Sequence, residues 1–195
     1  MDRRQFTIAA LAAAVAAAAT PASAKLYFNP DTNRWEERTI TSSGRGHYTP
    51  IPRTQVSYDG KFKPGTIIVE TAERRLYFVL PGGAALRYGI GVGRDGFRWS
   101  GQHSITRKAE WPGWTPPAEM RRRVPDLPAY MPGGPDNPLG ARALYIGATL
   151  YRIHGTSEPW TIGQAVSSGC IRLTNEDIID LYDRVRVGSL VVVRQ

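Results

Sequence analysis

The chain is poor in the residues that build disulfides and metal sites. Its 195 residues include three histidines and a single cysteine, at His47, His103, His154 and Cys170. One cysteine cannot form a disulfide within the chain, so its thiol is buried and inert, paired with another chain, or reactive. We expect no metal, because these residues offer no ligand pair at useful spacing. We also expect no cofactor, because the glycines within 89–93 lack the G-x-G-x-x-G spacing that precedes a helix in nucleotide-binding loops.

Long apolar runs are missing beyond the N-terminus. There, Arg3 and Arg4 precede an alanine-rich apolar run over 8–19, and 22–24 reads Ala-Ser-Ala, a typical cleavage site. The run is too short for a comfortable membrane span and has no polar face. We therefore interpret 1–24 as a signal peptide and expect no stable membrane span after its cleavage. The paired arginines fit both a twin-arginine signal and an ordinary secretory signal.

Acidic residues are outnumbered: the chain has 17 Asp and Glu against 25 Lys and Arg, a net charge of +8. The basic residues are scattered, apart from a cluster at 121–123, and no nucleic-acid motif accompanies them. We expect no nucleic-acid partner. Attraction to an acidic, extended polymer and a merely solvated basic surface both remain open.

The pattern along the chain predicts a mainly β domain. Residues 25–60 are polar and rich in turns, which predicts an extended arm. From 61 onward, β-branched and aromatic runs predict strands. They lie at 66–70, 75–80, 86–92, 143–147, 150–154 and 190–193. Thr174 is placed to cap a helix with an apolar face. The expected architecture is two packed sheets with one C-terminal α-helix.

Residues 94–142 are rich in proline, glycine and tryptophan and show little periodicity. Such a long irregular stretch inside a compact domain is either disordered or functional. Its tryptophans argue against disorder, because large apolar rings need burial or a ligand. We expect a structured lid, with simple core packing as the alternative.

The segment from His154 to Arg172 has the residue types of a nucleophile site. The thiolate is the reactive form of cysteine, and most of a free thiol is protonated at neutral pH, so a base must assist it. His154 lies sixteen residues before Cys170 and can supply that base if the chain folds back. Gly169 permits a backbone conformation closed to other residues just before the nucleophile. In a tight turn, the backbone N–H groups of Gly169 and Cys170 could bind an oxyanion.

Several polar residues near this pair have two possible roles. Arg172 could hold a substrate carboxylate in bidentate fashion, or form a structural salt bridge to Glu176 or Asp177. Ser167 and Ser168 could donate hydrogen bonds to substrate or shape the turn. His103 could line a substrate groove, although a structural histidine is more common.

The run HGT-x₆-G-x₂-VSSGCIRL over 154–173 resembles the signature of the L,D-transpeptidase catalytic domain. Many members have histidine directly before Gly-Cys, where this chain has Ser168, so His154 is the only histidine of the motif. Similarity extends upstream through the segments 97–101, 108–117 and 137–140. It covers about two thirds of the chain, at 61–195.

The resemblance implies an exported transpeptidase, in a periplasm, that acts on peptidoglycan stem peptides. Cys170 would attack the carbonyl between a diamino acid and D-alanine, and His154 would act as base and then acid. The backbone carbonyl of Gly155 would orient the imidazole. A lid over the cleft makes Trp111 a candidate for substrate binding. The acyl group would pass to an amine of a second stem peptide, or of an outer-membrane protein or lipoprotein.

Two other functions fit the same residues. A hydrolase of the L,D-carboxypeptidase type would use the same Cys–His pair with water as the acceptor. A non-catalytic module could bind peptidoglycan through the cleft and its tryptophans, without using Cys170.

Overall fold

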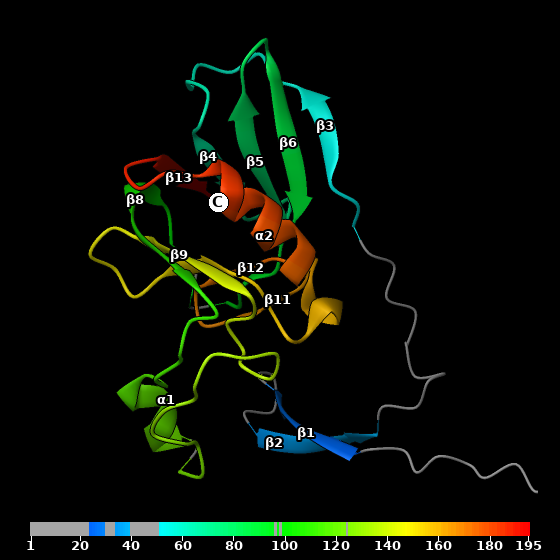
Figure 1. Ribbon diagram of the computed structural model, residues 1–195, viewed down its shortest axis with the longest axis vertical. Coiled ribbons are helices and arrows are strands. Elements are labelled where there is room, and N and C mark those ends of the chain that lie inside the picture. Colours follow the sequence, from blue (N-terminus) through cyan, green and yellow to red (C-terminus); the bar gives the residue numbers. More distant parts are fainter. Residues whose placement is uncertain (1–23, 30–33, 40–50, 96, 98, 124) are drawn as a thin grey trace, which may run out of the picture.

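A computed structural model of the protein describes residues 24–29, 34–39, 51–95, 97, 99–123 and 125–195 (Figure 1). The first strands in the chain are β1 (Ala24–Asn29), β2 (Arg34–Thr39), β3 (Thr54–Ser57), β4 (Ile67–Glu70), β5 (Arg75–Leu80), β6 (Ala84–Gly89) and β7 (Val92–Gly93). The later strands are β8 (Gly101–Glu110), β9 (Arg142–Ile146), β10 (Arg152–His154), β11 (Ala165–Ser167), β12 (Ile171–Arg172) and β13 (Leu190–Arg194). The helices are α1 (Ala118–Arg123), the short 3₁₀ helix η1 (Pro159–Thr161) and α2 (Asn175–Arg184).

Nine strands form one curled sheet in the order β12-β10-β9-β8-β13-β4-β5-β6-β3. Strand β8 belongs to both halves of this sheet. Its first residues, 101–104, pair with β13, and its later residues pair with β9. The two expected sheets are therefore continuous through one shared strand. Figure 1 shows helix α2 lying across the curled sheet, and the strands β7 and β11 form a separate parallel pair.

A β-bulge divides the two halves of β8. Ile105 lies opposite Ile146 and Arg107 lies opposite Tyr145, so Thr106 is the extra residue. The Thr106 hydroxyl donates to the backbone carbonyl of Gly147 at 3.0 Å, which holds the bulge in place. Because side chains alternate along a strand, one extra residue reverses the faces of all the residues that follow it.

Helix α2 completes the core. Ile178 and Leu181 are fully buried and pack in one cluster with apolar side chains from both halves of the sheet. The buried Tyr88 of β6 donates to the carboxylate of Asp180 at 2.6 Å, and this ties the helix to the sheet. At the other end, Lys108 donates to the carbonyls of Tyr182 and Val185 at 2.5 and 2.7 Å and so satisfies acceptors that the helix leaves open.

The mainly β class and the single C-terminal helix are confirmed. Strand β5 has the bounds that the sequence predicted, and the side chain of Thr174 caps α2 by accepting from the amide of Asp177 at 3.1 Å. Strand β8 was missed because its sequence has no apolar alternation: of its ten residues only Ile105 is buried. The stretch expected to be an arm contains strands as well, since β1 pairs with β2 and β3 pairs with β6.

The irregular region expected to be a lid is folded beyond β8. Trp114, Leu127 and Leu139 form a small buried cluster of their own, against which Met120 and Met131 pack. The Asn137 side chain donates to the carbonyls of Met131 and Pro132 and accepts from the amide of Leu139. This segment, with α1, extends away from the sheet in Figure 1. The region is therefore structured, Trp114 packs in a core as the alternative expected, and the role of the region as a lid stays a prediction.

In the part of the chain that the structure describes, no helix has the length and apolar character needed to cross a membrane. The predicted signal peptide lies outside the described residues, except for Ala24, which begins β1.

The helix cap can be tested by changing one hydroxyl. Replacing Thr174 with Ala removes the acceptor for the Asp177 amide, and we expect the free energy of unfolding to fall by about 1 kcal/mol in urea titrations. Thr174→Ser keeps the hydroxyl and should stay close to the wild type. Equal stability of the Ala and Ser variants would show that the cap contributes nothing.

Candidate active site

The sheet brings His154 and Cys170 to neighbouring strands. β10 ends at His154 and pairs in parallel with β12, and the register sets His154 beside Arg172 and Ile153 beside Ile171. Ile153 and Ile171 are core residues, so the side chains of His154 and Arg172 point to the opposite face. Cys170 directly precedes β12, two residues before Arg172, so strand alternation extended by one residue predicts the same face for its side chain. The predicted nucleophile and base are therefore brought close by two paired strands.

The turn before Cys170 is held by its own polar groups. The Ser167 hydroxyl donates to the carbonyl of Cys170 at 2.6 Å and accepts from the amide of Gly169 at 3.2 Å. Gly169 has φ +101°, a conformation that side-chain-bearing residues rarely adopt. Of the two roles considered for Ser167, shaping the turn is the one that the structure shows.

Two aromatic rings support the same turn. The indole of Trp99 donates to the carbonyl of Gly169 at 2.8 Å. It also stacks on Tyr151, with ring centroids 4.5 Å apart and an interplanar angle of 4°. A Cβ at Gly169 would lie 2.4 Å from Tyr151 Cε1, so glycine is needed for space as well as for conformation. The backbone around Cys170 is thus held by Ser167, Trp99 and Tyr151.

His154 is buried and oriented by a backbone carbonyl. Its side chain is 4% exposed, and its Nδ1 lies 2.5 Å from the carbonyl oxygen of Gly155. A carbonyl can only accept, so Nδ1 carries the proton and Nε2 of the neutral ring is left with a lone pair. This contact is the one that the resemblance implies for Gly155; its part in catalysis stays a prediction.

The environment keeps the imidazole neutral. Burial away from water lowers the pKa of His154 to about 3, and the positive charges of Arg172 and Arg152 act in the same direction. The hydrogen bond to the backbone carbonyl of Gly155 opposes this lowering in part. A neutral imidazole at physiological pH is the form that can accept a proton.

Arg172 forms a buried ion pair, but with neither expected partner. Its guanidinium lies 3.2 Å from Glu158 Oε2, and both side chains are nearly buried, at 13% and 12% exposed. Glu158 lies just before η1, in the loop that follows His154. The sequence alternatives were Glu176 and Asp177, which lie nearer in the chain. The carboxylate that faces Arg172 is therefore one of the protein's own.

The remaining predicted site residues differ in what surrounds them. The amide of Gly169, expected to bind an oxyanion, donates to Ser167, so a substrate oxygen would have to compete with that hydroxyl. Ser168 and Cys170 are partly exposed at the surface of the turn. Trp111 follows β8, is 44% exposed, and donates its amide to the carbonyl of Ala141 at 2.8 Å. The substrate-binding roles of Ser168 and Trp111 stay predictions.

Sequence reasoning gave no role at the site to Trp99, Tyr151 or Arg152. Trp99 belongs to a stretch that resembles the family, and Tyr151 and Arg152 lie on the strand that leads to His154, so their positions were available as signals. Their contacts with the Cys170 turn and with His154 arise only from the fold. Among the described residues no group of three or more His, Cys, Asp or Glu side chains could hold a metal ion.

Solved structures define the class of fold. The catalytic domain of the Enterococcus faecium L,D-transpeptidase acylated by ertapenem matches 69% of this chain and 100% of that chain, with a TM-score of 0.53 and 20% identity. An L,D-transpeptidase from Mycobacterium tuberculosis H37Rv matches 67% of this chain and 57% of that chain, with a TM-score of 0.52 and 15% identity. At these identities the likeness concerns the fold, which is that of L,D-transpeptidases.

Sequence comparison places the chain within that class. The YkuD family model, L,D-transpeptidase catalytic domain, matches residues 64–193. The chain belongs to this family. Two probable L,D-transpeptidases of Escherichia coli K12, ErfK/SrfK and YbiS, are 46% and 44% identical over 65% and 64% of this chain. The chain covers 43% of the length of each of them. A structure from Brucella melitensis, named a probable carnitine operon oxidoreductase, is 46% identical over 73% of this chain and 93% of that chain, with a TM-score of 0.51.

The depressed pKa of His154 predicts a specific loss of stability in acid. Unfolded, His154 binds a proton near its ordinary pKa of about 6.5, whereas folded it stays neutral down to about pH 3. Its contribution to stability is therefore fully present above pH 6.5 and is lost as the pH falls towards 3. We expect the unfolding midpoint of wild type to fall more steeply with decreasing pH than that of His154→Asn, measured by calorimetry. His103→Gln, the matched control, should follow the wild type; parallel curves for all three proteins would contradict the prediction.

Proposed function

We propose that this protein is an exported L,D-transpeptidase that acts on peptidoglycan stem peptides, with Cys170 as nucleophile and His154 as base. The observation that carries the proposal is the parallel pairing of β10 with β12, in which His154 lies beside Arg172 and Ile153 lies beside Ile171, the residue that follows Cys170. The neutral, oriented imidazole and the glycine-dependent turn before the cysteine support it further. Family membership supplies the reaction class.

The first half of the reaction forms a thioester. The thiol proton passes to Nε2 of His154 as the sulfur of Cys170 attacks the carbonyl carbon between the diamino acid and D-alanine. Because burial disfavours a charged imidazole, the proton is transferred to His154 as the sulfur attacks. The oxyanion would be held by the N–H of Cys170, together with that of Gly169 if the substrate displaces the Ser167 hydroxyl. The C–N bond then breaks, and the imidazolium returns the proton to the amine of D-alanine.

The second half transfers the acyl group. An acceptor amine attacks the thioester carbonyl, gives a proton to His154, and releases the Cys170 sulfur, which takes the proton back. An amine of a second stem peptide would give a crosslink, and an amine of an outer-membrane protein or lipoprotein would anchor that protein to the wall. With water as acceptor the same site would act as a hydrolase.

The predicted leader and the basic net charge support a place of action in the periplasm, beside an anionic polymer. The proposal does not include an oxidoreductase activity, although the Brucella protein is named for one. Gly89 ends β6, Gly91 lies between the strands and Gly93 ends β7, and the chain leads on toward strand β8, whereas a dinucleotide-binding loop leads into a helix.

A product assay tests the proposal. The full chain would be incubated with disaccharide-tetrapeptide fragments of peptidoglycan and analysed by mass spectrometry. We expect a dimer that has lost one D-alanine, formed by wild type and absent with Cys170→Ala, because the thioester needs the sulfur. Tripeptide without dimer would instead point to the hydrolase function or to a protein acceptor that the assay lacks.

Acylation by an inhibitor separates catalysis from binding. A carbapenem should raise the mass of wild type by one inhibitor molecule and leave Cys170→Ala unchanged; the Enterococcus faecium domain was solved in an ertapenem-acylated form. If wild type is neither acylated nor active, and both proteins bind peptidoglycan equally in sedimentation assays, the non-catalytic binding module replaces the proposal.

A further inference from the structure

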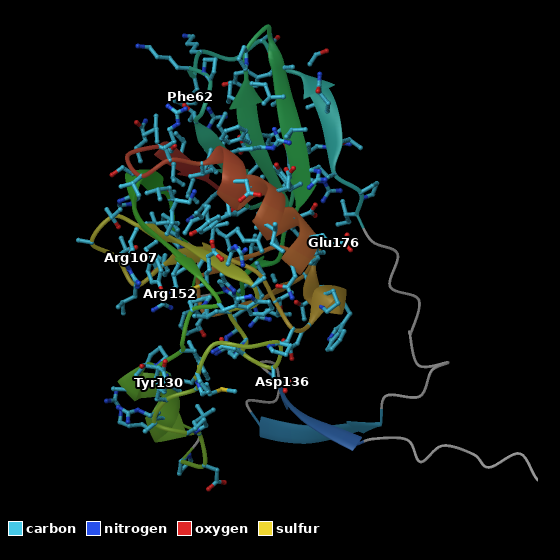
Figure 2. All side chains as sticks on the ribbon, in the orientation of Figure 1. Phe62, Arg107, Tyr130, Asp136, Arg152 and Glu176 are labelled. Carbon is cyan, nitrogen blue, oxygen red and sulfur yellow. The ribbon has the colours of Figure 1, made fainter. Side chains whose placement is uncertain are left out.

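A pair of arginines beside the Cys–His pair has no assigned role. We propose that Arg107 and Arg152, on either side of Tyr145, form a subsite that binds a free carboxylate of the peptidoglycan stem peptide. The inference rests on the proposed function and adds to it the recognition of substrate charge. Figure 2 shows the labelled Arg107 and Arg152 near each other on one side of the molecule.

The register across three strands places these residues in one row. Arg107 of β8 lies opposite Tyr145 of β9, and Tyr145 lies opposite Arg152 of β10. The bulge at Thr106 turns Arg107 to this face. Ile105 points into the core, and in an unbroken strand Arg107, two residues later, would point there as well. Bulges of this kind occur beside active sites, where they redirect a side chain.

The row of Arg107, Tyr145 and Arg152 leads to His154 along strand β10. Arg152 precedes His154 by two residues on β10, so both side chains lie on the same face of the strand. The residue between them, Ile153, pairs with Ile171, which directly follows Cys170. The effect of the Arg152 charge on His154 agrees with this proximity. A substrate extended from Cys170 along this face would meet the arginines.

Both guanidinium groups face one aromatic ring. The Cζ of Arg107 lies 3.6 Å from the centroid of the Tyr145 ring, and that of Arg152 lies 5.5 Å from it. Several other arginines of the described chain pair with carboxylates, in Arg53–Asp180, Arg142–Glu110, Arg172–Glu158, Arg184–Asp180 and Arg194–Glu70. Over the described residues, no Asp or Glu forms an ion pair with Arg107 or Arg152, and the buried Nε of Arg152 has no hydrogen-bond partner.

This arrangement selects for an anion. Two like charges gathered at one ring repel each other, and a carboxylate between them would relieve the repulsion and accept from both guanidinium groups. Arg172, the sequence candidate for this role, already faces Glu158. A stem peptide offers carboxylates on its glutamyl and diamino acid residues, which makes it a suitable ligand.

The test compares charged and neutral substrates. KM and kcat would be measured for wild type, Arg107→Gln, Arg152→Gln and the double variant. The substrates would be stem tetrapeptides with free carboxylates, and two analogues with either the glutamyl or the diamino acid carboxylate converted to an amide. With the free acid we expect KM to rise about tenfold for each arginine removed, with little change in kcat. With the analogue that lacks the recognised carboxylate, wild type and variants should have similar KM values. Arg186→Gln, at an exposed arginine after α2, is the matched control and should behave as wild type with every substrate.

The outcomes separate this inference from the proposed function. A wild type that forms no acyl-enzyme would overturn the function and the inference together. If wild type is active but the arginine variants still differ in KM between the free-acid and amide substrates as much as wild type does, the subsite alone would be overturned. Folding is checked by the unfolding midpoint and by the rate of carbapenem acylation. If an arginine variant of the active enzyme misfolds, binding replaces turnover as the measurement. The same tetrapeptides would then be titrated calorimetrically against Cys170→Ala and against Cys170→Ala that also carries the exposed Arg107→Gln. Equal affinities of these two proteins would overturn the subsite.

Discussion

The parallel pairing of two very short strands, β10 and β12, is the constraint on which the site depends. It matches Ile153 with Ile171 and His154 with Arg172, and a shift by one residue would send the imidazole into the core and an isoleucine to the surface. The register is stabilised because both isoleucines are fully or almost fully buried in the main apolar cluster. Burial of the two isoleucines on one face of the sheet thus places the polar side chains of His154 and Arg172 on the other face.

The remaining contacts fix the backbone before Cys170 and the orientation of the His154 ring, the two groups of the proposed reaction. Ser167, Trp99 and Tyr151 support the turn that contains Gly169, and the Gly155 carbonyl orients the imidazole. The Ser167 and Gly155 hydrogen bonds are local, whereas Trp99 joins the turn and Tyr151 from a segment far away in the sequence. Under the proposed function, these contacts would pre-organise Cys170 on rigid parts of the fold, which lowers the entropy cost of reaching the reactive geometry.

Positive charge on this face has two distinct uses. Arg172 is neutralised by Glu158 and still faces the imidazole, so it favours the neutral base. Arg107 and Arg152 share the ring of Tyr145 and leave their charge for an incoming anion. The scattered basic residues of the sequence are therefore not equivalent. Their partners in the fold decide whether each acts on the imidazole, on a helix end as Lys108 does, or on the substrate.

The sequence by itself determined the features that depend on local pattern. Alternating and apolar runs located β4, β5, β9 and β13, Thr174 marked the start of α2, and the spacing of His154 and Cys170 with the residues around them indicated the family. Tertiary structure alone decided the rest. Strand β8 has one buried residue in ten and is a strand because β13 and β9 pair with it on either side. The partner of Arg172 and the face of Arg107 follow from a distant loop and a bulge, and neither leaves a periodic signal in the chain.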